Sequence, residues 1–200
     1  MTPMRRPSTP RSQFESNLLR AKVFKLIQEK SFSKGRYKLV SGKESNYYLD
    51  MKPTMFNPEG ADALSELILD RLNEVTVDYV GGLALGAVPL ISTITMLSHC
   101  RGYPISGFFV RKDIKDHGTK KLVEGLARGE TLSGKRAVIL DDVTTTGGSA
   151  MIAVDAAKDL GAEIVLVLSI VDREEGATEF YQAQGIPFAA LFTASEFMAA

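Results

Sequence analysis

The stretch RAVILDDVTTTGGSAMIAV, residues 136–154, places two carboxylates between an apolar run and a turn rich in threonine and glycine. Residues 136–140 predict a buried strand, and Asp141 and Asp142 come at its carboxyl end. A helix is predicted from about 148 to 160. A strand, turn and helix in this order form one unit of a parallel α/β sheet, in which ligands bind beyond the carboxyl ends of the strands.

The turn between this strand and helix is suited to an anion. Glycines can adopt positive φ and bring backbone N–H groups close to a ligand, and a helix N-terminus adds partial positive charge. Hydroxyl groups of threonine supply further donors. We name residues 143–149 the Thr/Gly turn; its members are Val143, Thr144, Thr145, Thr146, Gly147, Gly148 and Ser149.

Asp141 and Asp142 require a different ligand group, because carboxylates accept hydrogen bonds and repel phosphate. Neighbouring hydroxyl groups satisfy them, so the combination predicts a sugar phosphate with its ribose diol on the acids and its 5′-phosphate on the turn. The alternative is that the acids only cap the turn. The stretch lacks the Gly-Lys-Thr/Ser triplet of nucleoside triphosphatases and the Gly-x-Gly-x-x-Gly turn of dinucleotide enzymes.

The segment VILDDVTTTGG resembles the phosphoribosyl pyrophosphate (PRPP) signature of the type I phosphoribosyltransferases. The resemblance implies an α/β fold in which helices flank a mainly parallel central sheet, with a small N-terminal hood. It also implies that Asp141, Asp142 and the Thr/Gly turn bind PRPP.

The rest of the chain fits one such domain over residues 13–200, after a tail at 1–12 that is predicted to be disordered. Helical periodicity covers 14–30 and 57–74, and turns with alternating apolar residues predict a hairpin or extended hood at about 31–52. Further apolar segments, alternating between strand and helix, lie at 77–84, 88–100, 105–110, 163–171 and 187–192.

Bulk composition excludes some partners. The chain has 24 Lys and Arg and 24 Asp and Glu, so no charge excess favours nucleic acid or an anionic membrane surface. No apolar run reaches the length of a membrane span. The single cysteine, Cys100, predicts a reducing cytoplasm and, from its apolar surroundings, a packed thiol. His99 is interpreted as structural.

A second charged segment, the basic loop of residues 111–125, has five Lys and Arg against three Asp and Glu. Such a loop could hold a diphosphate leaving group, or be a solvated loop without a partner. It resembles the flexible catalytic loop of orotate phosphoribosyltransferases, which folds over the active site of the neighbouring subunit in a dimer. The resemblance implies that four residues of this loop lie on the pyrophosphate side of the active site and are catalytic: Arg111, Lys112, Lys115 and His117.

Candidate residues for the base lie in two places. The hood segment SGKESNYYLDMK supplies Lys43, Tyr47, Tyr48 and Lys52, where a tyrosine can wall in a pyrimidine or only pack in a strand. Arg173 follows an apolar strand and can pair with a carboxylate, or form a surface ion pair with Glu174 or Glu175. The resemblance implies that Arg173 and Thr145 contact orotate. Where some members of the family have a lysine before Ser-Gly, this chain has Val40, which leaves the lysine that meets orotate open.

A third loop, at VGGLALGAVPL, contains Gly81, Gly82 and Gly86, which would allow unusual backbone turns. By resemblance it binds pyrophosphate through backbone amides. Some orotate enzymes have a lysine where this chain has Gly86, so only the backbone role would remain.

The resemblance therefore implies transfer of ribose 5-phosphate from PRPP to orotate by a homodimer. Magnesium would be bound mainly through the substrate, without a metal site made of protein side chains, and no protein nucleophile would be needed. The alternatives are a purine phosphoribosyltransferase, which should lack the basic loop pattern, and a regulator that senses PRPP while binding nucleic acid.

Overall fold

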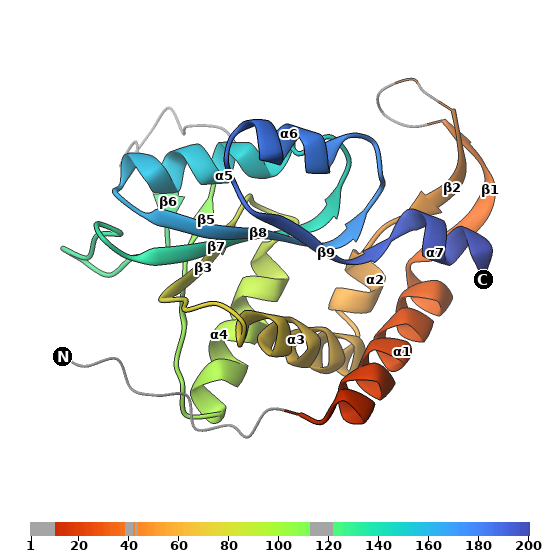
Figure 1. Cartoon of the computed structure of the whole chain (residues 1–200), viewed down its shortest axis with the longest axis horizontal. Coiled ribbons are helices and arrows are strands. Elements are labelled where there is room, and N and C mark those ends of the chain that lie inside the picture. Colours follow the sequence, from red (N-terminus) through yellow and green to blue (C-terminus); the bar gives the residue numbers. More distant parts are fainter. Residues whose placement is uncertain (1–10, 39–41, 43, 113–121) are drawn as a thin grey trace.

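The computed structural model describes residues 11–38, 42, 44–112 and 122–200. Its centre is a five-stranded sheet in the order β4-β3-β7-β8-β9, and every neighbouring pair in it is parallel. Helices α5 and α6 cover one face of this sheet, and α3 and α4 cover the other (Figure 1). The predicted α/β class, with a parallel central sheet between helices, is confirmed.

The sheet strands are β3 (Tyr79–Gly82), β4 (Ser106–Gly107), β7 (Arg136–Thr144), β8 (Glu163–Asp172) and β9 (Phe188–Thr193). The helices are α1 (Gln13–Lys30), α2 (Lys52–Met55), α3 (Pro58–Leu72), α4 (Val88–Cys100), α5 (Gly148–Asp159), α6 (Ala177–Ala183) and α7 (Ala194–Ala199). Two antiparallel pairs complete the described part of the chain: β1 (Phe32–Lys38) with β2 (Glu44–Leu49), and β5 (Phe109–Val110) with β6 (Val123–Glu124).

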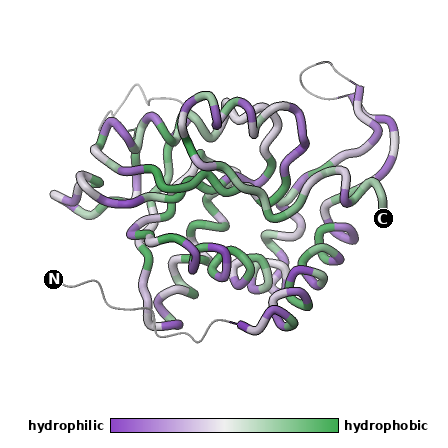
Figure 2. The backbone as a smooth tube through the Cα atoms, in the orientation of Figure 1, coloured by the Kyte–Doolittle hydropathy of each residue, from purple (hydrophilic) through white to green (hydrophobic). Residues whose placement is uncertain are grey.

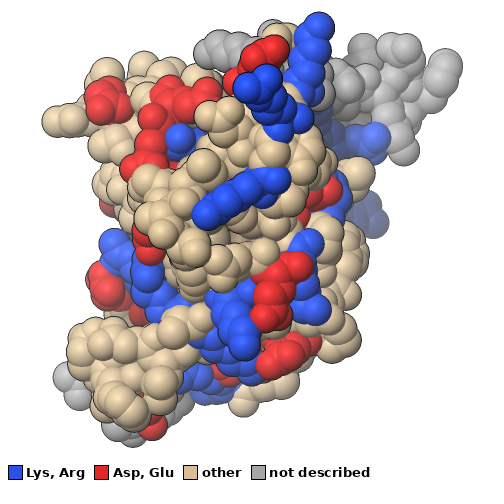
Figure 3. Space-filling model, turned by 90° about the vertical axis from the view of Figure 1, so that its right-hand side faces the viewer, with Lys and Arg blue, Asp and Glu red and all other residues tan. Residues whose placement is uncertain are grey.

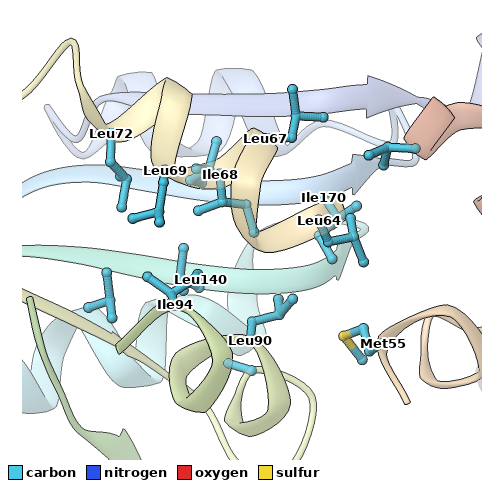
Figure 4. Close-up of a cluster of buried hydrophobic side chains, with 14 of the residues drawn as sticks. Met55, Leu64, Leu67, Ile68, Leu69, Leu72, Leu90, Ile94, Leu140 and Ile170 are labelled. Atoms are coloured by element: carbon cyan, nitrogen blue, oxygen red, sulfur yellow. The ribbon is translucent and has the colours of Figure 1, made fainter. Parts of the chain in front are cut away.

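The pleat of β7 divides the core into two layers. Val138 and Leu140 belong to the cluster formed with α3 and α4, whereas Ala137 and Ile139 belong to the cluster beneath α5 and α6. Side chains alternate across a strand, so an apolar run without polar interruption fills both layers. Figure 4 shows the first layer, where leucines of α3 and α4 pack against Leu140 and Ile170.

Local signals fix the first two long helices. Ser12 and Glu15 form a capping box at the start of α1. Asn57 caps α3 by accepting from the N–H of Gly60 at 3.1 Å, and Pro58 occupies the first turn. The predicted helices at 14–30 and 57–74 are therefore confirmed, the second ending two residues early.

The hood is the predicted hairpin, formed by β1 and β2, and it lies beside α7 at the right of Figure 1. Phe32 of β1 contacts Phe197 of α7, with 5.5 Å between ring centroids. Phe197 also stacks on Phe24 of α1 at 4.4 Å. The aromatic cluster thus joins the hood to both ends of the chain.

Several sequence expectations need correction. The segment 105–110 divides between two sheets, because β4 pairs with β3 while β5 pairs with β6. The sequence interpretation did not predict the short helices α2, α6 and α7. The predicted packing of Cys100 is wrong: its thiol is exposed at the end of α4. The strand β7 also continues to Thr144, two residues past the acids.

Hydropathy and charge follow the layers. The strands of the central sheet are mostly hydrophobic, and purple hydrophilic positions concentrate on the outer sides of the helices (Figure 2). On the face turned to the viewer in Figure 3, positive and negative side chains are interspersed. In the part of the chain that the structure describes, no helix has the length and hydropathy needed to cross a membrane.

Candidate functional site

The carboxyl ends of β7 and β8 bring the predicted motifs together. The backbone N–H of Arg173, just after β8, donates to the carbonyl of Thr144 at the end of β7, at 2.9 Å. Asp142, in β7, lies against the loop that follows β3. The two acids, the Thr/Gly turn and Arg173 therefore share one edge of the sheet, as the strand pattern predicted.

Asp141 faces the layer of α5 and α6. Its carboxylate accepts a hydrogen bond of 2.8 Å from the hydroxyl of Thr144. The pKa of Asp141 is raised to about 7, because burial and the negative charge of Asp142 together outweigh the lowering effect of the Thr144 hydrogen bond. A ligand that donates hydrogen bonds to this carboxylate would favour its charged form.

Asp142 faces the opposite layer, as the alternation of β7 requires. A Cβ at position 86 would lie 2.5 Å from its Oδ1, so Gly86 is required for the close approach of this carboxylate. Burial raises the pKa of Asp142, and the positive charge of Lys52 lowers it. The Lys52 ammonium itself bonds Asp50 at 3.0 Å, at the start of α2. The two acids therefore face opposite sides of the sheet.

The Thr/Gly turn provides the predicted helix N-terminus. Gly147 has φ of 90° and is the N-cap of α5, and within the part of the chain that the structure describes no side chain caps this helix. Asp141 accepts a hydrogen bond within the turn from Thr144, so the acids also stabilise the turn, as the alternative interpretation allowed. Two details were wrong: Gly148 is helical, without positive φ, and the Thr144 hydroxyl is buried on Asp141 and not available to a ligand. Thr145 is half-buried, and Thr146 and Ser149 are exposed.

Arg173 joins the site to the hood. Its guanidinium lies 4.6 Å from the ring centre of Tyr47 and 3.5 Å from the hydroxyl of Ser45, both in β2. It also forms an ion pair of 3.0 Å with Glu175, and the side chain is only 9% exposed. The ion pair with a neighbouring glutamate, which was the alternative interpretation of Arg173, is therefore present, but it lies within a partly buried group that includes the hood.

The remaining hood residues have different positions. Tyr47 is half-buried and stacks on Phe32, whereas Tyr48 is exposed and packs against Tyr37. Because neighbours in a strand point to opposite faces, Tyr48 is not brought to Arg173. Lys43 and Val40 lie outside the described residues.

The basic loop begins and ends in the antiparallel pair of β5 and β6. The backbone N–H of Arg111 donates to the carbonyl of Leu122 at 2.9 Å, and its guanidinium pairs with Glu124 at 3.3 Å. Lys112 is exposed. Lys115 and His117 lie outside the described residues, so their predicted roles stay predictions.

The glycines after residue 80 have a reason that the sequence did not indicate. Gly81 and Gly82 lie within β3, and none of the three glycines in this segment has positive φ. A Cβ at Gly81 would overlap the ring of Phe108, and one at Gly82 would overlap Ala87. Close packing requires these glycines, and the expectation of unusual turns is wrong for them. The loop itself contains a cis peptide bond between Ala84 and Leu85.

The oxygen donors at this edge are of the kind that magnesium prefers. Asp141 and Asp142 offer carboxylates whose raised pKa values reflect burial, and a nearby cation would favour their charged forms. Among the described residues, no group of three or more His, Cys, Asp or Glu side chains is arranged to hold a metal ion.

Two residues have contacts at this site that the sequence interpretation did not predict. Lys52 belongs to the hood segment, but only the fold shows that its charge acts on Asp142. Tyr181 of α6 donates a 2.7 Å hydrogen bond from its hydroxyl to the carbonyl of Gly147. A lone tyrosine in a short amphipathic segment carries no sequence signal for this contact.

The chain is similar to curated proteins named orotate phosphoribosyltransferase. It is 53% identical over 181 residues to that of Bradyrhizobium diazoefficiens, covering 90% of this chain and 97% of the relative. It is 56% identical over 179 residues to that of Rhodopseudomonas palustris strain TIE-1, covering 90% and 96%. No family model matches the chain.

Solved structures agree with these relatives. The orotate phosphoribosyltransferase of Mycobacterium tuberculosis in complex with Fe(III) dicitrate has a TM-score of 0.77 and 34% identity, covering 90% of this chain and 98% of that one. The same enzyme in complex with PRPP has a TM-score of 0.74 and 30% identity, covering 90% and 99%. The described fold is thus shared across the length of these proteins.

Proposed function

The chain belongs to the orotate phosphoribosyltransferase family, and from this premise we propose how its own residues perform the transfer of ribose 5-phosphate from PRPP to orotate. The products are orotidine 5′-monophosphate and pyrophosphate. One observation carries the assignment of roles: two half-buried acids, the N-terminus of α5 and Arg173 meet at one edge of the sheet.

The ribosyl donor occupies the space between β7 and α5. Asp141 and Asp142 accept hydrogen bonds from the ribose hydroxyls, and these bonds compensate for the burial that raises their pKa values. The backbone N–H groups of residues 145–149 bind the 5′-phosphate at the N-terminus of α5. The acids and the turn together fix both ends of the sugar.

Orotate lies on the hood side of the ribose. The Arg173 guanidinium can leave Glu175 for the carboxylate of orotate or hold both, and the ring of Tyr47 walls the pocket. Thr145, a half-buried residue of the Thr/Gly turn, is assigned to the base from the resemblance. Tyr48 and Lys43 remain candidates from the resemblance alone.

Positioning and charge stabilisation account for the rate. The anomeric carbon passes through an oxocarbenium-like state as the orotate nitrogen replaces pyrophosphate, and the chain supplies no nucleophile. Arg111, Lys112, Lys115 and His117 hold the leaving pyrophosphate by charge-assisted hydrogen bonds. Magnesium, when bound through PRPP, neutralises charge on the diphosphate.

We further propose a homodimer in which the basic loop acts at the partner's site. Beside β5, where this loop begins, a groove of about 380 Å³ is lined mostly by apolar residues of α4 and of the segment around Phe108. Met96, at this groove, is 58% exposed. An apolar surface next to the root of the loop supports contact with a second copy there.

A reducing cytoplasm suits a chain with one exposed cysteine.

The test is an assay of the purified protein with PRPP and magnesium, given orotate, uracil or hypoxanthine in parallel. We expect pyrophosphate release with orotate alone, because Arg173 offers a cation for the carboxylate that the other two bases lack. Arg173→Ala should raise the KM for orotate and leave the KM for PRPP near that of the unchanged protein. Turnover with hypoxanthine and none with orotate would contradict the proposal.

A further inference from the structure

Tyr181 connects α6 to the turn that precedes α5. Its side chain is 0% exposed, and its ring stacks on Phe188 at 5.0 Å and meets Phe180 edge-on at 5.3 Å. Burial and the nearby charge of Asp141 raise the pKa of Tyr181, so its hydroxyl stays protonated and donates. The acceptor is the carbonyl of Gly147 at 2.7 Å.

The same carbonyl accepts a second hydrogen bond, from the N–H of Met151 at 3.1 Å. With two donors on one oxygen, the plane of the peptide between Gly147 and Gly148 has little freedom to rotate. The N–H of Gly148 belongs to this plane and points opposite to the carbonyl in a trans peptide. Tyr181 thereby helps to keep the first N–H of α5 pointing away from the body of the helix.

The ring of Tyr181 also restricts the turn from the side. A Cβ at Gly147 would lie 2.9 Å from Cε2 of Tyr181 and 2.8 Å from Cδ1 of Phe180. Gly147 is thus seated against both rings while it holds its φ of 90°. An N–H that is already oriented loses less conformational freedom on binding than a mobile one.

We propose that Tyr181 is a positioning residue of the phosphate site: it orients the N–H groups at the start of α5 toward the 5′-phosphate of the ribosyl donor without touching that donor. The inference rests on the proposed function, because that function places the phosphate at this turn. It adds α6, an element outside the sequence motif, to the machinery of PRPP binding.

The test is Tyr181→Phe, which removes the hydroxyl and keeps the ring against Gly147. We expect the KM for PRPP and the Kd for ribose 5-phosphate to rise roughly threefold to tenfold, the range that one lost hydrogen bond allows. The kcat and the KM for orotate should change by less than about twofold, because the lost bond acts on ground-state and transition-state binding of the phosphate alike.

Tyr79→Phe is the matched control. Tyr79 is also buried, and its hydroxyl donates to Glu130 at the opposite end of the sheet. Both variants should lower the melting temperature, but Tyr79→Phe should bind ribose 5-phosphate like the unchanged protein. If the two variants lose stability and neither loses phosphate affinity, Tyr181 has only a structural role. If the unchanged protein binds neither PRPP nor ribose 5-phosphate, the proposed function fails, and this inference fails with it.

Discussion

At the scale of residues, the site contains two carboxyl groups whose surroundings in the free protein disfavour the charged form. Asp141 has a pKa of about 7 because burial opposes its ionisation, and Asp142 has a raised pKa for the same reason. An acid whose pKa is raised in this way lowers the stability of the folded protein at neutral pH. The free protein should therefore lose stability when these carboxyls ionise, and a bound ligand should remove that loss.

Asp141→Asn tests this cost. A carboxyl whose folded pKa is raised binds its proton more tightly in the folded state, so stability falls as the pH rises from about 4 to about 7. The variant cannot ionise. Its melting temperature should therefore match that of the unchanged protein near pH 4 and exceed it by a few degrees at pH 8.

At pH 8, PRPP should raise the melting temperature of the unchanged protein above that of Asp141→Asn, because a ligand stabilises only the protein that binds it. Asp78→Asn serves as the control of opposite sign, since Arg136 holds the pKa of Asp78 low and the variant should lose stability at pH 8. Equal stabilisation of Asp141→Asn and the unchanged protein by PRPP would refute the role of Asp141 in ribose binding.

At the scale of elements, the site depends on contacts between segments far apart in the chain. The hood reaches Arg173 through Tyr47 and Ser45, and it is fixed at its base by a hydrogen bond of 2.7 Å between Ser31 and Thr54. Helix α7 adds Phe197 beneath Phe32. The last helix of the chain therefore supports the wall of the proposed orotate pocket.

Phe197→Ala should show this support. The side chain is fully buried among Phe24, Phe32 and Phe192, and its removal should lower the free energy of unfolding by about 3–5 kcal/mol in urea titrations. The KM for orotate should also rise, because the hood loses its contact with α7. Phe14→Ala, at a residue 71% exposed, should cost less than about 0.5 kcal/mol. If Phe197→Ala lowered the free energy of unfolding by less than about 1 kcal/mol, the proposed support of the hood by α7 would be contradicted.

At the scale of the whole molecule, the proposed dimer makes each site a product of two chains. The root of the basic loop lies beside the apolar groove of α4, whereas the acids lie at the end of β7. If the loop acts at the partner's site, a defect in the loop and a defect in the acids belong to different halves of the same site.

Mixing two inactive variants tests this division. Lys115→Ala and Asp141→Asn should each be nearly inactive, and subunit exchange between them should restore up to about a quarter of full activity, since one site in each mixed dimer is intact. Mixing Asp141→Asn with Asp142→Asn is the control and should restore none. Failure of the first mixture in a sample shown to contain mixed dimers would place the loop at its own subunit's site.

The sequence by itself determined the strand from residue 136 to 140, the Thr/Gly turn and the first helices, because apolar periodicity, caps and glycine act over a few neighbouring residues. It also placed Arg173 at the correct edge, since the carboxyl ends of parallel strands always meet there. Only the tertiary structure decided that Gly81 and Gly86 admit close packing, that Lys52 acts on Asp142, and that Tyr181 holds Gly147. Those contacts join residues far apart in the chain, and no local pattern encodes which side chain will arrive from another element.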